Sequence, residues 1–309
     1  MSPRRTLAPR PDLLEVAPYM SPQMPGFEGI VLNTNESPYP PPPGLIETLT
    51  KEFASLALNR YPNRDATALI ADLATHCEWP ADGIWVANGS NEVFLHLLLT
   101  FGGPGRKAMT FEPTYSLHSL IPRITSTTAV PVSRTEDFAV DREVAVAAVE
   151  RERPEIVILC SPNNPTGGVD AHGTVRAIAE ATPGIVVVDE AYGEFADPSE
   201  SMRDLLGEYP NLVITRTFSK AWRLAGARIG YMLAASQVVR ELLRVRLPYH
   251  LSSITQAIGR AAIRYAPETV DLARSIARER DRLIVGLQSL GVTTFPSRAN
   301  FVLFEVDDT

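Results

Sequence analysis

The chain has 309 residues, of which 45% are hydrophobic and 21% charged, and its formal net charge is −7. This is the composition of a globular protein with a sizeable core, and the negative charge disfavours nucleic acid and anionic membranes as partners. No apolar stretch reaches the roughly 20 residues of a membrane span, and no apolar segment follows the basic N-terminus as it would in a secretory signal. We therefore expect a soluble protein of the cytoplasm.

The first 45 residues are rich in proline, and we expect an extended arm that lies over the surface. Helices are predicted next, at residues 44–57 and 65–76. Apolar strands follow at 84–87, 107–110, 129–132, 156–160, 185–188 and 212–215, with helices between them at 91–101, 115–124, 141–151 and 174–181. Short buried strands that alternate with helices indicate βαβ units. We therefore expect an α/β fold with a mostly parallel sheet covered by helices.

The C-terminal part has a different pattern, with two helices at 255–265 and 267–290 and two strands at 292–295 and 301–304. We expect three parts: an N-terminal arm over residues 1–45, a large domain over 46–250, and a small α/β domain over 251–309. The chain stops directly after the last predicted strand, so we expect the small domain to be incomplete.

Cysteine, histidine and lysine are all sparse. Cys77 and Cys160 are too few and too far apart for a disulfide framework or a zinc site, and the five histidines show no metal-ligand spacing, so no metal is expected. Lysine occurs only at Lys51, Lys107 and Lys220. A lysine at a functional position therefore stands out against an arginine-rich background.

Lys220 follows the predicted strand 212–215, where ligands bind at the carboxyl edge of a parallel sheet. Thr217 and Ser219 supply hydroxyls beside it, and Arg228 follows between glycines. Hydroxyls, glycines and a fixed arginine are suited to a phosphate group. A lysine beside a phosphate indicates either a nucleotide or a phosphorylated aldehyde cofactor, and the absence of a Walker pattern disfavours the nucleotide.

Three other polar segments follow predicted strands. Asp189 ends an apolar strand, where a buried carboxylate needs a partner, either a metal or a protonated heterocyclic nitrogen. The turn around Asn164 is either a pair of ordinary turns or a rigid loop that aims an amide at a ligand. Ser90 and Asn91 open a helix, where they act either as caps or as part of an anion site.

Together these motifs carry a resemblance to a known family. The segments Asn164-Pro165-Thr166-Gly167, Asp189-Glu190-Ala191-Tyr192 and Ser219-Lys220 with Arg228 resemble, in that order, fold-type I pyridoxal-phosphate (PLP) aminotransferases. More narrowly, the segments at 32–36, 60–62, 89–92, 113–115 and 247–251 resemble histidinol-phosphate aminotransferases. The resemblance extends from about residue 18 to residue 304.

The resemblance implies a role for each matching residue. Lys220 would carry PLP covalently and move the substrate proton, and Asp189 would pair with the pyridine nitrogen. Asn164 and Tyr192 would bind the phenolic oxygen, and Tyr115 would stack on the ring.

Other matching residues would bind the phosphate or the substrate. Ser219, Arg228, Thr217 and the amides of Ser90 and Asn91 would hold the cofactor phosphate. Tyr61 would reach the phosphate of a neighbouring subunit, which implies a homodimer with shared sites. Tyr19 and Asn35 resemble residues of the family's substrate arm.

The implied reaction converts L-histidinol phosphate and 2-oxoglutarate to imidazole acetol phosphate and L-glutamate in histidine biosynthesis. The alternatives are an aromatic amino-acid aminotransferase, a PLP-dependent decarboxylase of a phosphorylated amino acid, and an inactive truncated paralogue. The chain departs from the family at Trp222 and Arg223 and in ending early, before the arginine that binds substrate. A chain lacking that segment is expected to keep its cofactor residues and to transaminate poorly.

Overall fold

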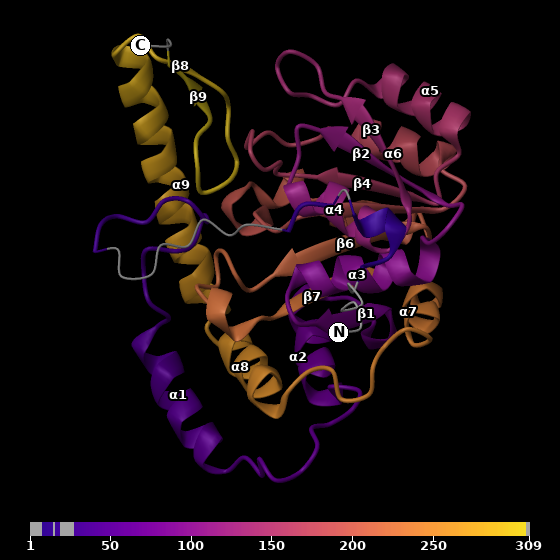
Figure 1. The fold of residues 1–309 in the computed structure, drawn as a ribbon. Helices are drawn as coiled ribbons and strands as arrows, with labels where there is room; N and C mark the ends of the chain where they lie inside the picture. The colour runs from indigo at the N-terminus through magenta and orange to yellow at the C-terminus, as the bar shows by residue number, and fades with distance from the viewer. Residues whose placement is uncertain (1–7, 15, 19–27, 307–309) are drawn as a thin grey trace, which may run out of the picture.

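Seven strands form one sheet at the centre of the computed structural model, which describes residues 8–14, 16–18 and 28–306 (Figure 1). Their order across the sheet is β1-β7-β6-β5-β4-β2-β3, and only β7 runs antiparallel to its neighbours. The strands are β1 (Ile84–Ala87), β2 (Lys107–Glu112), β3 (Thr128–Ser133), β4 (Ile156–Cys160), β5 (Ile185–Asp189), β6 (Leu212–Thr217) and β7 (Gly230–Ala234). The predicted α/β fold with a mostly parallel sheet is confirmed.

Helices cover both faces of this sheet (Figure 1). Along β5, Val187 packs against one set of helices, and Val186 and Val188 pack against the other. The first set is α3 (Ser90–Phe101), α4 (Ser116–Ile124) and α7 (Ser236–Leu242); the second is α1 (Pro43–Ala54), α2 (Thr67–Cys77), α5 (Arg142–Glu152), α6 (His172–Ala181) and α8 (Ser253–Ile263). Because both faces are buried, β4, the first four residues of β5 and the first three of β6 are continuous apolar runs.

Strand β7 and helix α7 are absent from the sequence-based prediction. Gly230 opens β7, and a strand that begins at a glycine directly after a polar loop lacks the usual boundary signal. Short 3-10 helices complete the connections: η1 (Pro11–Leu13), η2 (Ala81–Gly83), η3 (Gly193–Phe195), η4 (Pro198–Glu200), η5 (Met202–Gly207) and η6 (Ala225–Ala227).

The C-terminal elements are α9 (Ala266–Ser289) and the antiparallel pair β8 (Thr293–Thr294) and β9 (Phe304–Glu305), which lie to one side of the central sheet (Figure 1). Helix α8 packs against α1 and α2, since Ala261 and Ala262 belong to the buried cluster that contains these two helices. The division of the chain near residue 250 stays a prediction.

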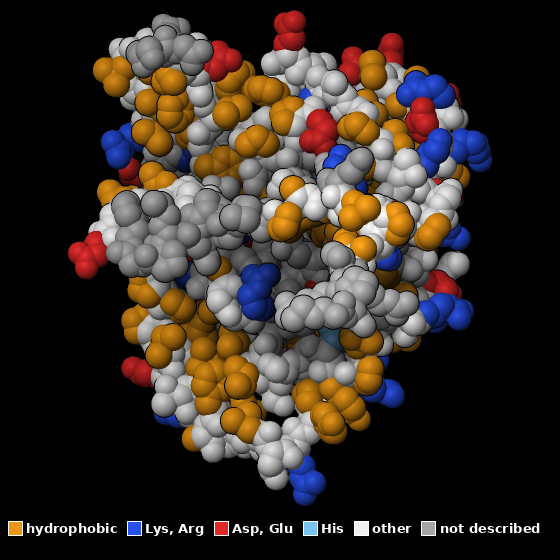
Figure 2. Space-filling view, viewed as in Figure 1, with side chains coloured by type: hydrophobic (Ala, Val, Ile, Leu, Met, Phe, Trp, Pro, Cys, Tyr) orange, Lys and Arg blue, Asp and Glu red, His pale blue; other side chains and the backbone are white. Residues whose placement is uncertain are grey.

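The surface combines scattered charges with a concentration of apolar side chains. Figure 2 shows these apolar side chains in the lower part of the view, where Figure 1 places α1 and α8. Exposed large apolar residues in these elements and the segments beside them include Ile46, Leu58, Tyr61, Leu247 and Tyr249. Within the described ranges, no helix combines the length and the apolarity needed to cross a membrane.

The close packing of β4 and β5 gives a prediction for Gly184, which directly precedes β5. A Cβ at this position would collide with the backbone carbonyl of Glu155, which also accepts a hydrogen bond from the amide of Ile185. We expect Gly184→Ala to lower the free energy of unfolding by about 1–3 kcal/mol. In the control Gly173→Ala, the new Cβ in α6 meets open space, and the alanine should add about 0.5–1 kcal/mol. Denaturant unfolding measures both, and equal effects would contradict the close approach.

Candidate functional site

A cavity of about 410 Å³ opens at the carboxyl edge of the parallel strands. Its walls come from the segments after β1, β2, β4, β5 and β6 and from residues 33–36 of the N-terminal arm. It brings together ten of the residues singled out as cofactor residues: Ser90, Asn91, Tyr115, Asn164, Asp189, Tyr192, Thr217, Ser219, Lys220 and Arg228. Residues that lie more than 130 positions apart in the chain therefore line one space.

The Asp189 carboxylate is buried at the floor of this cavity, with an exposed fraction of 2%. Its Oδ1 accepts hydrogen bonds from the Thr215 hydroxyl and the Ala191 amide, both at 3.1 Å. Its Oδ2 lies 3.0 Å from Nε2 of His118, which is itself buried on α4. Three donors from three segments thus compensate the burial of this charge.

Lys220 lines the same cavity, and its hydrogen-bond partner comes from the N-terminal arm. Its Nζ donates to the carbonyl oxygen of Thr34 at 2.7 Å. Burial lowers the pKa of Lys220 to about 8, against the opposing effect of Glu36 and Asp189. An amine with this pKa is partly neutral near physiological pH and is able to act as a nucleophile or a base.

Two amides converge on the Tyr192 hydroxyl. Nδ2 of Asn35 donates to it at 3.1 Å and Nδ2 of Asn164 at 3.3 Å. Burial raises the pKa of Tyr192, so its phenol keeps its proton. Nζ of Lys220 lies 5.6 Å from the centre of the Tyr192 ring. The hydroxyl and amide groups that the resemblance assigns to a phenolic oxygen are therefore next to the lysine.

The other end of the cavity is built for an anion. The first amides of α3 receive no side-chain cap because Gly89 occupies the N-cap position. Arg228 lies so close that a Cβ on Gly89 would be 2.5 Å from its Nη2, and Nη1 of Arg228 lies 3.4 Å from the Ser219 hydroxyl. A Cβ on Gly230 would collide with the Ser90 amide. Free amides, a guanidinium and hydroxyls in this arrangement fit a phosphate group.

The three other residues expected at the site are Asn35, Tyr61 and Tyr19. Asn35 lines the cavity, as described above. Tyr61 does not: its ring is 80% exposed and stacks on Tyr249, with the ring centres 4.5 Å apart. Tyr19 lies outside the described residues.

The structure adds residues that the sequence-based reasoning did not single out. His118 contacts Asp189, and Thr34 and Glu36 of the arm face Lys220. A lone histidine on a helix has no distinctive spacing, and a backbone carbonyl has no sequence signal at all. Only the position of His118 on the helix that follows Tyr115 hinted at the site.

The potential metal-ligand atoms of His118, Cys160 and Asp189 all lie within 4.8 Å of one another, which is close enough for all three to reach one metal ion. Burial raises the pKa of the Cys160 thiol, whereas metals bind the thiolate. The Asp189 carboxylate already accepts bonds from Thr215 and Ala191. These features favour an organic ligand that contacts Asp189 rather than a metal ion.

Comparison with known proteins agrees with this geometry. Residues 28–308 match the model of the family described as aminotransferase class I and II. The histidinol-phosphate aminotransferase of Thermobifida fusca is 50% identical over 300 residues, which cover 96% of this chain and 81% of that protein. The one from Mycobacterium avium is 45% identical over 304 residues, covering 96% and 76%. A crystal structure of histidinol-phosphate aminotransferase from Sinorhizobium meliloti in complex with pyridoxal-5'-phosphate aligns with a TM-score of 0.82 and 28% identity, covering 89% of this chain and 75% of that one.

The environment of Lys220 gives a prediction for Glu36, which raises the pKa of Lys220 more than Asp189 does. Because the Glu36 carboxylate raises the pKa of Lys220, Glu36→Gln should move that pKa below about 8. The pH dependence of Lys220 acetylation in cofactor-free protein, followed by mass spectrometry with Lys51 as internal reference, measures the change. Glu47→Gln, on the exposed side of α1, is the control and should have no effect. An unchanged or raised midpoint in Glu36→Gln would show that the carboxylate does not act on the lysine.

Proposed function

The chain belongs to the aminotransferase class I and II family, and we propose that it is a histidinol-phosphate aminotransferase. It would transfer the amino group of L-histidinol phosphate to 2-oxoglutarate, giving imidazole acetol phosphate and L-glutamate, with PLP as cofactor. The observation that carries the proposal is one cavity that holds Lys220, the buried Asp189 and the anion pocket at Arg228. We also propose a cytoplasmic location, which the two buried free cysteines support because a reducing compartment preserves thiols.

The residues of the cavity fit PLP at each of its polar groups. The pocket formed by Gly89, Gly230 and Arg228, which a Cβ on either glycine would fill, suits the phosphate. Asp189 would pair with the pyridine nitrogen, and Asn164 and Tyr192 would bind the phenolic oxygen. When bound, PLP supplies an electron sink for breaking the bond between the substrate Cα and its proton.

Other residues of the cavity would complete the binding of the cofactor. Ser90, Asn91, Thr217 and Ser219 would add amide and hydroxyl donors to the phosphate. Tyr115, at the N-terminus of α4, would lie against the ring. The contacts between Arg228, Ser219 and Thr217 support this assignment because they already arrange the donors around one point.

Lys220 would serve both as the attachment point for the cofactor and as the group that moves the proton. Its Nζ would take a proton from the substrate Cα and return it to the cofactor side, and a pKa of about 8 makes both directions accessible near neutral pH. The Asp189 carboxylate accepts hydrogen bonds from Thr215 and Ala191, and His118 would hold it in place. Burial of these groups excludes water from the reacting atoms.

The identity of the amino-group donor is a separate part of the proposal. Asn35 lines the cavity from the arm and would contact the substrate, and Tyr19 would do so from the same arm. The names of the relatives from Thermobifida fusca and Mycobacterium avium favour histidinol phosphate over aromatic amino acids or a decarboxylation substrate. Half-transamination of the PLP-loaded protein with histidinol phosphate, phenylalanine and a phosphorylated amino acid separates these options. Conversion of phenylalanine at a higher kcat/KM than histidinol phosphate would refute the substrate assignment.

Removal of the Lys220 amine tests the cofactor assignment. We expect Lys220→Ala to lose the visible absorption of the lysine-bound cofactor and all measurable transamination, because a methyl group neither binds PLP covalently nor moves a proton. Borohydride reduction followed by peptide mass spectrometry should find the trapped cofactor on Lys220 in the parent protein and nowhere in the variant. Lys51→Ala, on the exposed side of α1, is the control. Cofactor trapped in Lys220→Ala would refute the assignment.

We further propose that the protein is a homodimer in which Tyr61 reaches the phosphate of the other subunit. The 80% exposure of Tyr61 and its stacking on Tyr249, which is itself exposed, support an interface there. Leu58 and Leu247, which lie close to Tyr61 and Tyr249 in the chain, are also exposed.

Subunit complementation tests this sharing of sites. Lys220→Ala and Tyr61→Ala should each be impaired alone, but a mixed dimer contains one site with both residues intact. Co-refolding the two variants should therefore restore activity, measured as histidinol phosphate turnover. Activity no higher than the sum of the separate variants, or a monomeric mass by light scattering, would contradict shared sites.

A further inference from the structure

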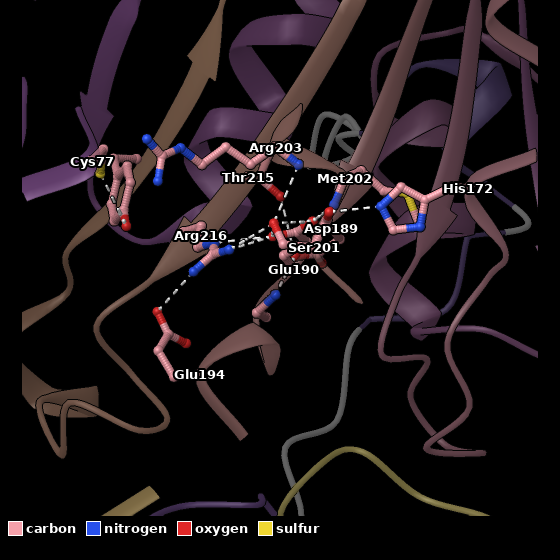
Figure 3. A network of polar contacts seen from close by, with 12 residues as sticks. Cys77, His172, Asp189, Glu190, Glu194, Ser201, Met202, Arg203, Thr215 and Arg216 are labelled. Carbon is pink, nitrogen blue, oxygen red and sulfur yellow. Dashed lines mark hydrogen bonds and ion pairs between the residues drawn. The ribbon is translucent and has the colours of Figure 1, made fainter. Parts of the chain in front are cut away.

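A network of buried charges lies behind the cavity, next to Asp189 (Figure 3). Glu190 follows Asp189 in the chain and faces the other way, toward the segment that opens η5. Its Oε2 accepts hydrogen bonds from Arg216, at 3.1 Å from Nε and 2.5 Å from Nη2, and from the Ser201 hydroxyl at 2.8 Å. Its Oε1 accepts from the Met202 amide at 2.7 Å. Glu190 is 1% exposed and has partners at both oxygens.

Arg216 connects this carboxylate to a second one. Its Nη1 lies 3.6 Å from Oε1 of Glu194, in η3, and the same oxygen accepts a hydrogen bond from the Trp222 indole at 3.3 Å. Figure 3 shows the Arg216 side chain lying between Glu190 and Glu194. The guanidinium thus bridges two segments that are separate in the chain.

The residues of the network lie close in the chain to the functional residues of the cavity. Glu190 directly follows Asp189, and Glu190 and Glu194 flank Tyr192 on the segment after β5. Arg216, near the end of β6, and Trp222, in the loop that follows it, flank Lys220 in the chain. The network therefore holds the chain before and after Tyr192, and it also holds the chain before and after Lys220.

The network acts on the cavity only through the backbone. None of its four members is among the described residues that line the cavity. Backbone pairing continues the connection, because the Glu190 amide donates to the Thr215 carbonyl at 2.9 Å while the Thr215 hydroxyl donates to Asp189. The bond from Thr215 to Asp189 on the cavity side and the bonds from Arg216 to Glu190 on the other side therefore both hold β5 and β6 together.

Stability alone is a poor explanation for such a network. Two carboxylates share one guanidinium, Oε2 of Glu194 is buried without a hydrogen-bond partner among the described residues, and burial raises the pKa of Glu194. Buried ion pairs seldom stabilise a protein more than apolar residues of the same volume, and their best attested use is to specify one arrangement. A single arrangement matters here because reacting groups must be held to within a fraction of an ångström.

We propose that Arg216, with Glu190 and Glu194, is a positioning residue that holds Lys220 and Asp189 in the geometry needed for proton transfer. The inference rests on the proposed aminotransferase function. Arg216 touches neither substrate nor cofactor in this arrangement. It sets the spacing of the two loops that do.

The test compares Arg216→Gln with the double variant Arg216→Gln/Glu190→Gln. The double variant removes both charges of the Arg216–Glu190 pair, so that neither is left buried without its partner. Arg260→Gln is the matched control, since Arg260 pairs with Asp72 at 2.9 Å on partly exposed helices away from the cavity. We expect kcat per bound PLP to fall about 100-fold in both test variants while KM changes little, because misplacement affects the reaction more than binding. The control should keep the parent kcat.

A second measurement needs no cofactor. Loosened loops admit water around Lys220, and because burial is what lowers its pKa, the pH midpoint of its acetylation in cofactor-free protein should rise from about 8. The midpoint in Arg260→Gln should stay at the parent value.

The outcomes separate positioning from a purely structural role. A fall in melting temperature with unchanged kcat per bound PLP and an unchanged acetylation midpoint, in either test variant, would overturn the inference. If Arg216→Gln does not fold, the charge-balanced double variant decides. If the parent protein neither binds PLP nor transaminates, the proposed function fails, and the acetylation midpoint still tests the inference separately.

Discussion

The buried carboxylate of Asp189 is the constraint around which the site is arranged. Four buried apolar residues of β5 precede it and place it at the edge of the sheet, where a charge without partners would cost several kcal/mol. The structure meets this cost with donors from α4, from β6 and from its own loop. Those donors also restrict the carboxylate to one orientation, so the groups around it can be placed relative to a fixed point.

The antiparallel strand β7 explains why the anion pocket forms where it does. Gly230, its first residue, pairs with Ala87 of β1 on one side and with Thr217 of β6 on the other. The start of α3 and the loop that carries Ser219 therefore meet at one glycine. A side chain at that glycine would separate them, so the pocket depends on a strand that contributes no functional side chain.

Lys220 is tuned by opposing effects that come from different parts of the chain. Burial favours the neutral amine, while Glu36 on the arm and Asp189 on β5 favour the charged one. The arm also supplies the Thr34 carbonyl that orients Nζ. The arm thus supplies the hydrogen bond and one of the two carboxylates that act on this amine, the sheet edge supplies the other carboxylate, and the network at Arg216 holds the amine in place.

The sequence by itself determined the alternation of strands and helices and the identity of most cavity residues, because apolar periodicity and compact motifs such as the one ending in Lys220 are local properties. The tertiary structure decided β7, the role of His118, the approach of Thr34 and Glu36, and the bridge from Arg216 to Glu190 and Glu194. These features join residues far apart in the chain, and His118 and Asp189 are 71 positions apart. A contact of this kind depends on how the strands pair and the helices pack, which no local pattern records.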